Sequence, residues 1–299
     1  MEPAFVIYKK IIMNQINLFI ELTRLKKPVG FMLLFWPCSW GLTIAYDFNK
    51  EKITYFFFLI LFFLGAVLMR SAGCIVNDIV DRKFDKKVKR TKNRPIATGK
   101  ISVLKGAIYA AILCLIALII LLQFNNFTIF LALISMPLAF TYPLMKRLTY
   151  WPQLFLGITF NYGLILGWTS VESQIDIILF IFYFGAACWT VGYDTIYGYQ
   201  DIKDDEIIGL KSTSIKFKHS PIQFISIFYF FFLISLLTVG IFLKLNSFFY
   251  IVYLIILLQM IFLQLKKINI KHSHKCLEIF KSNNLLGFLV LFSLIIGKI

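Results

Sequence analysis

Long apolar runs alternate with short polar segments along the chain. A helix needs about 20 mostly apolar residues to cross the hydrocarbon core of a bilayer. The runs therefore predict an all-α polytopic integral membrane protein, with about nine transmembrane helices surrounding a central cavity. The predicted spans are residues 29–46, 53–76, 103–122, 127–145, 152–170, 175–198, 221–243, 247–265 and 283–299.

The overall composition agrees with this pattern. Hydrophobic residues make up 59% of the chain and charged residues 15%, whereas soluble domains carry about 25% charged residues. We expect a single intramembrane domain over residues 1–299, surrounded by membrane lipid. The five cysteines are odd in number and lack a C-x-x-C pair, so we interpret them as small core residues rather than zinc ligands.

The polar segments alternate in charge. Basic residues gather before the first span, after the second, fourth and sixth spans, and over residues 266–281. The positive-inside rule then places the N-terminus in the cytoplasm and the C-terminus outside. Most of the net charge of +16 is thus a feature of topology, and no nucleic-acid-binding pattern accompanies it. We expect a protein of the bacterial inner membrane whose N-terminus and basic loops face the cytoplasm.

Two acidic clusters stand at the ends of long apolar runs. The first is Asn77, Asp78, Asp81 and Asp85, and the second is Asp194, Asp201, Asp204 and Asp205. At about 100° per residue, each cluster predicts one carboxylate-lined face of a helix. Carboxylates at the edge of a membrane are costly unless a partner compensates their charge.

Two such faces opposite each other would suit Mg²⁺, a hard cation that binds carboxylates together with substrate phosphates. The alternative for a single cluster is a solvated helix end paired with nearby Lys and Arg. Two clusters on one side of the membrane favour the metal. A transporter or binding protein with an acidic metal site is the competing class, but the acidic sites of transporters usually lie near the middle of the membrane.

The motifs around these clusters resemble the UbiA superfamily of intramembrane prenyltransferases. The match covers most of the chain, and its pieces occur in order at the right spacing. They are residues 24–30 with 36–37, residues 69–74, residues 90–95, residues 142–149 with 152–153, residues 193–197 and residues 211–213. Within the superfamily the chain is most similar to the 4-hydroxybenzoate polyprenyltransferases of ubiquinone biosynthesis.

The resemblance implies an Mg²⁺-dependent transfer of a polyprenyl group from polyprenyl diphosphate to the ring carbon ortho to the hydroxyl of 4-hydroxybenzoate. The products would be 3-polyprenyl-4-hydroxybenzoate and diphosphate, and another aromatic acceptor stays open. The implied metal ligands are Asn77, Asp78, Asp81, Asp85, Asp194, Asp201 and Asp205, of which Asp81, Asp194 and Asp201 are also the catalytic candidates. The substrate-binding candidates are Arg24, Arg70, Arg82, Lys86, Arg94, Tyr142, Lys146, Arg147 and Tyr197.

Arg70 differs from the other cations because it lies inside a predicted span. It precedes Asn77 by two helical turns, which places it roughly 10 Å deeper in the membrane. An arginine at such a depth normally faces a cavity and has a partner. We predict that Arg70 pairs with the carboxylate of the aromatic acceptor or holds the diphosphate; the alternative is a purely structural contact.

Overall fold

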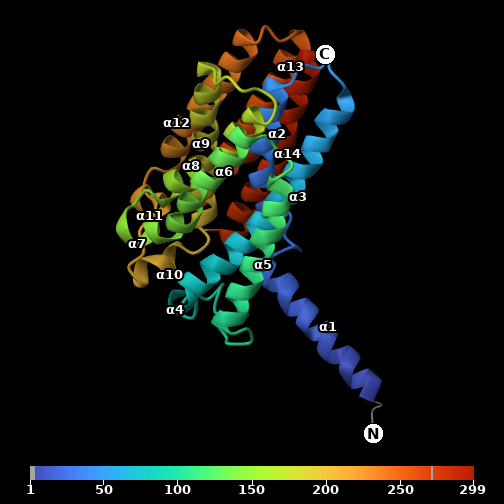
Figure 1. Cartoon of the computed structure of the whole chain (residues 1–299). Helices are drawn as coiled ribbons and strands as arrows, with labels where there is room; N and C mark the ends of the chain where they lie inside the picture. The colour runs from blue at the N-terminus through green and yellow to red at the C-terminus, as the bar shows by residue number, and fades with distance from the viewer. Residues whose placement is uncertain (1–3, 271) are drawn as a thin grey trace.

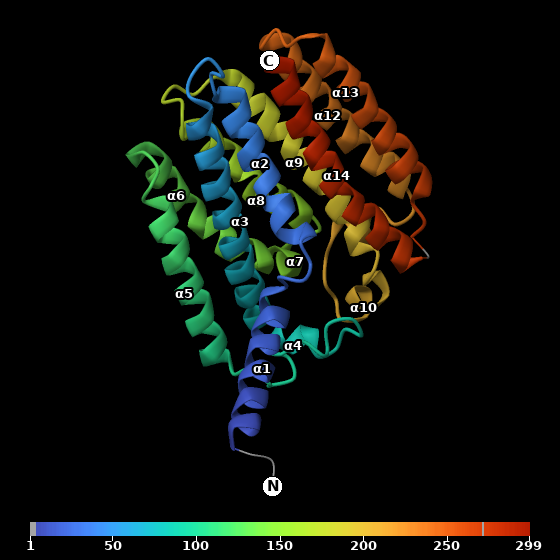
Figure 2. The same ribbon diagram turned by 90° about the vertical axis from the view of Figure 1, so that its right-hand side faces the viewer.

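The structure is a computed structural model that describes residues 4–270 and 272–299. Residues 1–3 and Lys271, which the charge analysis included, lie outside the described residues. In the described part the chain forms helices and no strand, as the apolar runs predict. Figures 1 and 2 show an elongated bundle with the C-terminus at one end and the N-terminal helix projecting from the other.

Long helices make up the body of the bundle, and short helices lie at the end from which the N-terminal helix projects (Figure 1). The long helices are α1 (Ala4–Thr23), α2 (Val29–Ala45), α3 (Lys52–Val80), α5 (Val103–Leu121), α6 (Asn126–Thr141), α8 (Pro152–Thr169), α9 (Ile177–Gly198), α12 (Pro221–Phe242), α13 (Ser247–Gln259) and α14 (Ser273–Lys298). The short segments are α4 (Arg82–Asp85), η1 (Tyr142–Leu144), α7 (Met145–Leu148), α10 (Ile202–Ile207), α11 (Thr213–Lys216), η2 (Met260–Gln264) and η3 (Leu265–Lys267).

Seven of the described helices are long and apolar enough to cross a membrane. The other two predicted spans correspond to α2, which has 17 residues, and α8, which has 18. Both are largely buried, and α8 carries the buried polar residues Gln153 and Asn161, which lower its hydropathy. A helix enclosed by other helices needs less apolar surface than one facing lipid. The total of nine spans stays a prediction.

Two helices extend beyond the predicted spans. Helix α3 continues to Val80 rather than ending near residue 76, and α14 begins at Ser273 rather than near residue 283. Hydropathy marks the part of a helix that is embedded in lipid, and both helices extend past that part into polar sequence. The extension of α3 carries Asn77 and Asp78 on its last turn.

Helices α2, α8 and α9 pack closely at the centre of the bundle. A Cβ atom at Gly41 would collide with the backbone of Leu164, and one at Gly167 would collide with the backbone of Cys38, so glycine permits the close approach of α2 and α8. Trp40 of α2 and Trp189 of α9 are fully buried, with ring centroids 5.1 Å apart. This rigid centre supports the ends of α3 and α9, where the acidic clusters begin.

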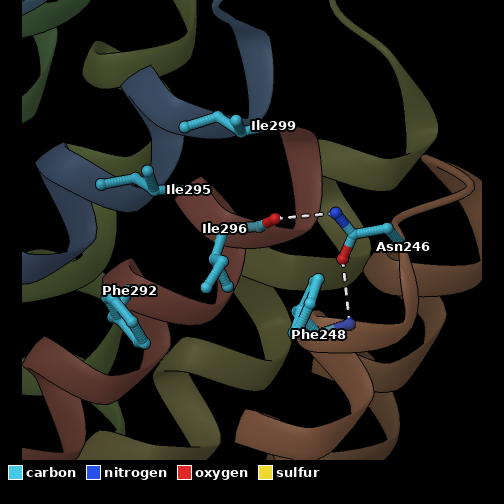
Figure 3. Close-up of a pocket in the computed structure, with 6 residues that line it drawn as sticks. All are labelled: Asn246, Phe248, Phe292, Ile295, Ile296 and Ile299. Atoms are coloured by element: carbon cyan, nitrogen blue, oxygen red, sulfur yellow. Dashed lines mark hydrogen bonds between the residues drawn. The ribbon is translucent and has the colours of Figure 1, made fainter.

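A small pocket of about 400 Å³ lies at the far end of the bundle, between the start of α13 and the end of α14. Figure 3 shows its apolar lining and the Asn246 amide, which donates to the carbonyl of Ile296 and accepts from the amide of Phe248. Asn246 is the N-cap of α13, so its hydrogen bonds have a structural role. The pocket is remote from both acidic clusters.

Candidate active site

The first acidic cluster lies where α3 gives way to α4. Asp81 is the one residue between the two helices, and its neighbours keep nearly helical hydrogen bonds, because Asp81 N donates to Asn77 O and Asp85 N donates to Asp81 O, both at 2.8 Å. The three carboxylates are 1% to 6% exposed. The sequence therefore places a dense negative charge in a site with little access to water.

Cations from two other segments neutralise Asp78 and Asp85. Arg24, which follows α1, forms an ion pair with Asp78. Arg94 reaches both carboxylates through the same Nη1 atom, at 3.0 Å from Asp78 and 2.8 Å from Asp85. One nitrogen can contact both only if they share a face, as the helical spacing predicts for this pair.

Asp81 has a different set of cation partners, which come from α7. Lys146 forms an ion pair with Asp81, and Nη2 of Arg147 lies 3.4 Å from the other carboxylate oxygen. Arg147 also donates to the carbonyl of Val80 at 3.0 Å. The backbone amide of Lys211 donates to the carbonyl of Lys146 at 2.8 Å, which links α7 to the segment after the second cluster.

The second cluster does not form one continuous helical face, so the predicted single stripe is wrong there. Helix α9 ends at Gly198, and Asp201 precedes α10, which carries Asp204 and Asp205. The amide of Asp201 donates to the carbonyl of Gly198 at 3.3 Å, in a tightened turn that changes the direction of the chain. Asp194 alone remains on α9.

The loop after the first cluster joins the two clusters. Nε of Arg90 donates to both carboxylate oxygens of Asp201 at 2.9 and 2.8 Å, and its Nη1 donates to the hydroxyl of Tyr197 at 3.1 Å. The backbone amide of Lys89 donates to Asp204 at 2.9 Å. Burial raises the pKa of the Asp205 carboxyl to about 6, and the charge of Asp201 adds to this rise.

A deeper part of the site lies between α3, α8 and α9. Asp194 makes no hydrogen bond or ion pair with the described residues, although the charge of Arg70 acts on it. Arg70 also interacts electrostatically with Tyr142 and Tyr197. Its Nε atom is buried without a hydrogen-bond partner among the described residues, and its guanidinium lies 5.4 Å from the ring centroid of Phe160.

Most of the predicted site residues lie at the two acidic clusters or around Arg70. Arg82 and Lys86 are exposed, and the side chain of Asn77 forms no hydrogen bond with the described residues. The sequence prediction also missed Arg90 and Phe160. Arg90 is the first residue of the basic run at residues 90–95, so the sequence pattern could have identified it. Phe160 is one phenylalanine among 33, and nothing in the sequence distinguishes it.

The donor set suits a hard cation. Its candidates are carboxylate and amide oxygens, and such ligands match Mg²⁺, which binds one or two carboxylates and completes its shell with water and phosphate. Within residues 4–270 and 272–299, no three His, Cys, Asp or Glu side chains come together closely enough to hold a metal ion. The carboxylates instead contact Arg and Lys, the side chains that best bind phosphate.

Comparison with known proteins assigns the chain to a family. Residues 34–292 match the UbiA prenyltransferase family. The chain belongs to this family. The family domain includes both acidic clusters, Arg70, Arg94 and the α7 cations, but begins after Arg24.

Named relatives in the UbiA family extend the comparison. The chain is 40% identical over 285 residues to the mitochondrial 4-hydroxybenzoate polyprenyltransferase of Bos taurus, covering 94% of this chain and 75% of the relative. It is 36% identical over 289 residues to the 4-hydroxybenzoate octaprenyltransferase of Francisella tularensis subsp. novicida (strain U112), covering 96% and 99%. The mitochondrial enzyme of Rattus norvegicus is 46% identical over 209 residues, and the match spans 70% of this chain and 55% of that protein.

Solved structures of UbiA homologues share the fold. The apo structure of a homologue from Aeropyrum pernix K1 aligns with a TM-score of 0.74 at 21% identity, over 90% of this chain and 98% of that one. A homologue from Archaeoglobus fulgidus, solved with GPP and Mg²⁺, aligns with a TM-score of 0.67 at 16% identity, over 93% and 99%. The helical membrane fold of the family is therefore present in this chain.

Proposed function

We propose that this protein transfers a polyprenyl group from polyprenyl diphosphate to the ring carbon ortho to the hydroxyl of 4-hydroxybenzoate, as a step of ubiquinone biosynthesis. The observation that carries the proposal is that Arg and Lys side chains pair with buried carboxylates of both clusters, close to Arg70 and Asp194. The names of the bovine and Francisella relatives supply the substrates. A transporter would need its acidic site near the middle of the membrane, whereas these clusters lie at one end of the bundle (Figure 2).

The donor end of the reaction is built from the acidic clusters. Asn77, Asp81, Asp85 and Asp201 are the candidates to hold Mg²⁺, with Asp78 and Asp205 beside them. Mg²⁺, when bound, neutralises charge on the diphosphate and so makes it a better leaving group. The Archaeoglobus homologue, solved with GPP and Mg²⁺, supports the requirement for Mg²⁺.

The cations that now face the carboxylates would bind the diphosphate. Arg94, Lys146 and Arg147 lie at the cluster, and each can turn from a carboxylate oxygen to a phosphate oxygen because both are anionic acceptors. Such cations stabilise the negative charge that develops on the diphosphate as the allylic C–O bond breaks. Arg82 and Lys86 are exposed beside the cluster and can join them on the solvent side.

The acceptor end lies deeper. Nε of Arg70 has no hydrogen-bond partner among the described residues, and the guanidinium would bind the carboxylate of 4-hydroxybenzoate, with Tyr142 and Tyr197 nearby. The new C–C bond forms as the bond to the departing diphosphate breaks, and the ring then loses its proton. Asp194, free of ion pairs and close to Arg70, is the base that takes this proton.

The test is an assay in membranes with Mg²⁺, a long-chain polyprenyl diphosphate and a panel of aromatic acids, with mass spectrometry of the lipid product. We expect 4-hydroxybenzoate to be prenylated and EDTA to stop the reaction. Product from another acid only would support the alternative acceptor. Full activity in EDTA would contradict the metal-dependent mechanism.

The orientation in the membrane is part of the proposal. We propose a bacterial inner-membrane protein whose acidic clusters face the cytoplasm, an orientation supported by the charge of the loops. The contact of Arg90 with Asp201 supports placing the two clusters on the same side of the membrane. Single cysteines at Asn93 and Lys211 should then react from the cytoplasmic side, and those at Asn125 and Ser173 from the outside. Labelling of positions 93 and 211 from opposite sides would exclude one shared site.

A further inference from the structure

The guanidinium of Arg70 is enclosed by two residues that carry no charge. Gly30 lies in the first turn of α2, where a Cβ atom would stand 2.9 Å from Nε of Arg70, 3.5 Å from Nη2 and 3.6 Å from Cζ. Phe160 of α8 presents its ring at 5.4 Å from Cζ, within the range of a cation–π contact. Arg70 therefore fills the space between the α2 backbone and an aromatic ring.

We infer that Gly30 and Phe160 are positioning residues, and that by setting the orientation of Arg70 they make the site select aromatic acceptors with a carboxylate. This inference rests on the proposed function, and in particular on the pairing of Arg70 with the acceptor. Gly30 leaves room for the guanidinium because it has no side chain, and Phe160 contacts the guanidinium with the face of its ring.

The geometry explains why both are needed. A Cβ at 2.9 Å from a nitrogen is closer than ordinary van der Waals contact, so any side chain at position 30 pushes the guanidinium away from α2. The ring of Phe160 is 9% exposed and packs edge to face against Tyr142 with centroids 6.3 Å apart, so it is held in place beside the guanidinium. A bidentate contact with a planar carboxylate depends on the orientation of the guanidinium, so a small displacement removes it.

The same helices offer matched controls. Gly65 lies on α3 with Arg70, and a Cβ there meets nothing within 4 Å. Phe155 lies on α8 with Phe160 but is 38% exposed on the outer surface. Gly65→Ala and Phe155→Leu therefore repeat the chemical changes away from Arg70.

The experiment measures three quantities for each variant: the KM for 4-hydroxybenzoate, the KM for the polyprenyl diphosphate, and the inhibition constant of 4-hydroxybenzamide, the neutral analogue. In Gly30→Ala and Phe160→Leu we expect the acceptor KM to rise about tenfold, the effect of losing one charge-assisted hydrogen bond. The other two constants should change less than about twofold, because neither involves the acceptor carboxylate. Phe160→Tyr, which keeps the ring, should restore the acceptor KM.

The outcomes distinguish a wrong inference about Gly30 and Phe160 from a wrong proposed function. An equal rise for the acid and the amide would assign both residues to general packing and overturn the inference, and so would a rise confined to the donor KM. If Gly30→Ala does not fold, Phe160→Leu with its Tyr rescue decides alone. A wild-type chain that forms no prenylated 4-hydroxybenzoate contradicts the proposed function instead.

Discussion

The two acidic clusters use carboxylates in different ways. Each of the three acids in the first cluster already contacts cations: Arg24 and Arg94 at Asp78, Arg94 at Asp85, and Lys146 and Arg147 at Asp81. In the second cluster, Asp201 has an Arg partner, whereas Asp194 has no ion pair within the described chain. The negative charge of the first cluster is thus balanced by neighbouring cations, whereas part of the charge of the second cluster is not.

This difference separates two roles within one site. Cations that pair with buried carboxylates are already held where a diphosphate would bind, so they need little rearrangement to stabilise a leaving group. A carboxylate without a cation partner keeps its basicity and can accept a proton. We therefore associate the first cluster with donor binding and Asp194 with the acceptor side.

The largest expected effect is on turnover. Asp81→Asn and Asp194→Asn should each lower kcat by at least about a hundredfold, because each removes a charge that acts in the transition state. The measurement is product formation by detergent-solubilised protein at saturating concentrations of both substrates. Retention of more than a tenth of wild-type activity by either variant would remove that residue from the mechanism.

The next largest expected effect is on the stability of the protein, which should differ between substitutions in the two clusters. Asp78→Asn leaves Arg24 and Arg94 beside a neutral side chain and should destabilise the metal-free protein by about 3 kcal/mol, the lower end for breaking a buried ion pair, since both cations are partly exposed. Asp194→Asn breaks no ion pair and should leave the stability unchanged or slightly higher. Denaturation in mixed detergent micelles measures both, and an equal loss would mean that Asp194 is also compensated.

A smaller effect is expected where the clusters meet. Arg90 is 39% exposed, so its pair with Asp201 should contribute less than about 1 kcal/mol to stability. Arg90→Gln should instead raise the KM for the polyprenyl diphosphate by a few fold, because Asp201 and Tyr197 lose their orientation. Lys87→Gln, an exposed change in the same loop, is the control. Identical kinetics in both variants would show that the contact between the clusters has no catalytic consequence.

The smallest effect concerns pH. Burial raises the pKa of Asp205 to about 6 in the folded protein, whereas its unfolded pKa is about 4. The folded state thus binds the proton more tightly, and stability should fall as pH rises from about 4 to about 6 and then stay level. Because Asp205 is partly exposed, the decrease should not exceed about 2 °C in melting temperature. Scans of metal-free protein should show less decrease in Asp205→Asn, and an unchanged profile would exclude Asp205 as its source.

Much of the fold and part of the site were predictable from local pattern. The apolar runs located the long helices, because a lipid-embedded helix must be apolar over its embedded length. The spacing of Asp78 and Asp85 predicted their common face, because the backbone stays nearly helical through Asp81. The same arithmetic failed at Asp201, because α9 ends at Gly198 and the turn that follows changes the direction of the chain.

The sequence by itself determined the setting, a helical membrane protein with two acidic clusters, since hydropathy and motif spacing are properties of consecutive residues. Only the tertiary structure decided the partners. Arg90 reaches Asp201 across 111 positions, and Lys146 reaches Asp81 across 65. Gly30 and Phe160 meet at Arg70 because α2, α3 and α8 pack together. Contacts between distant segments depend on how side chains fill the space between helices, and that packing has no counterpart in the order of residues along the chain.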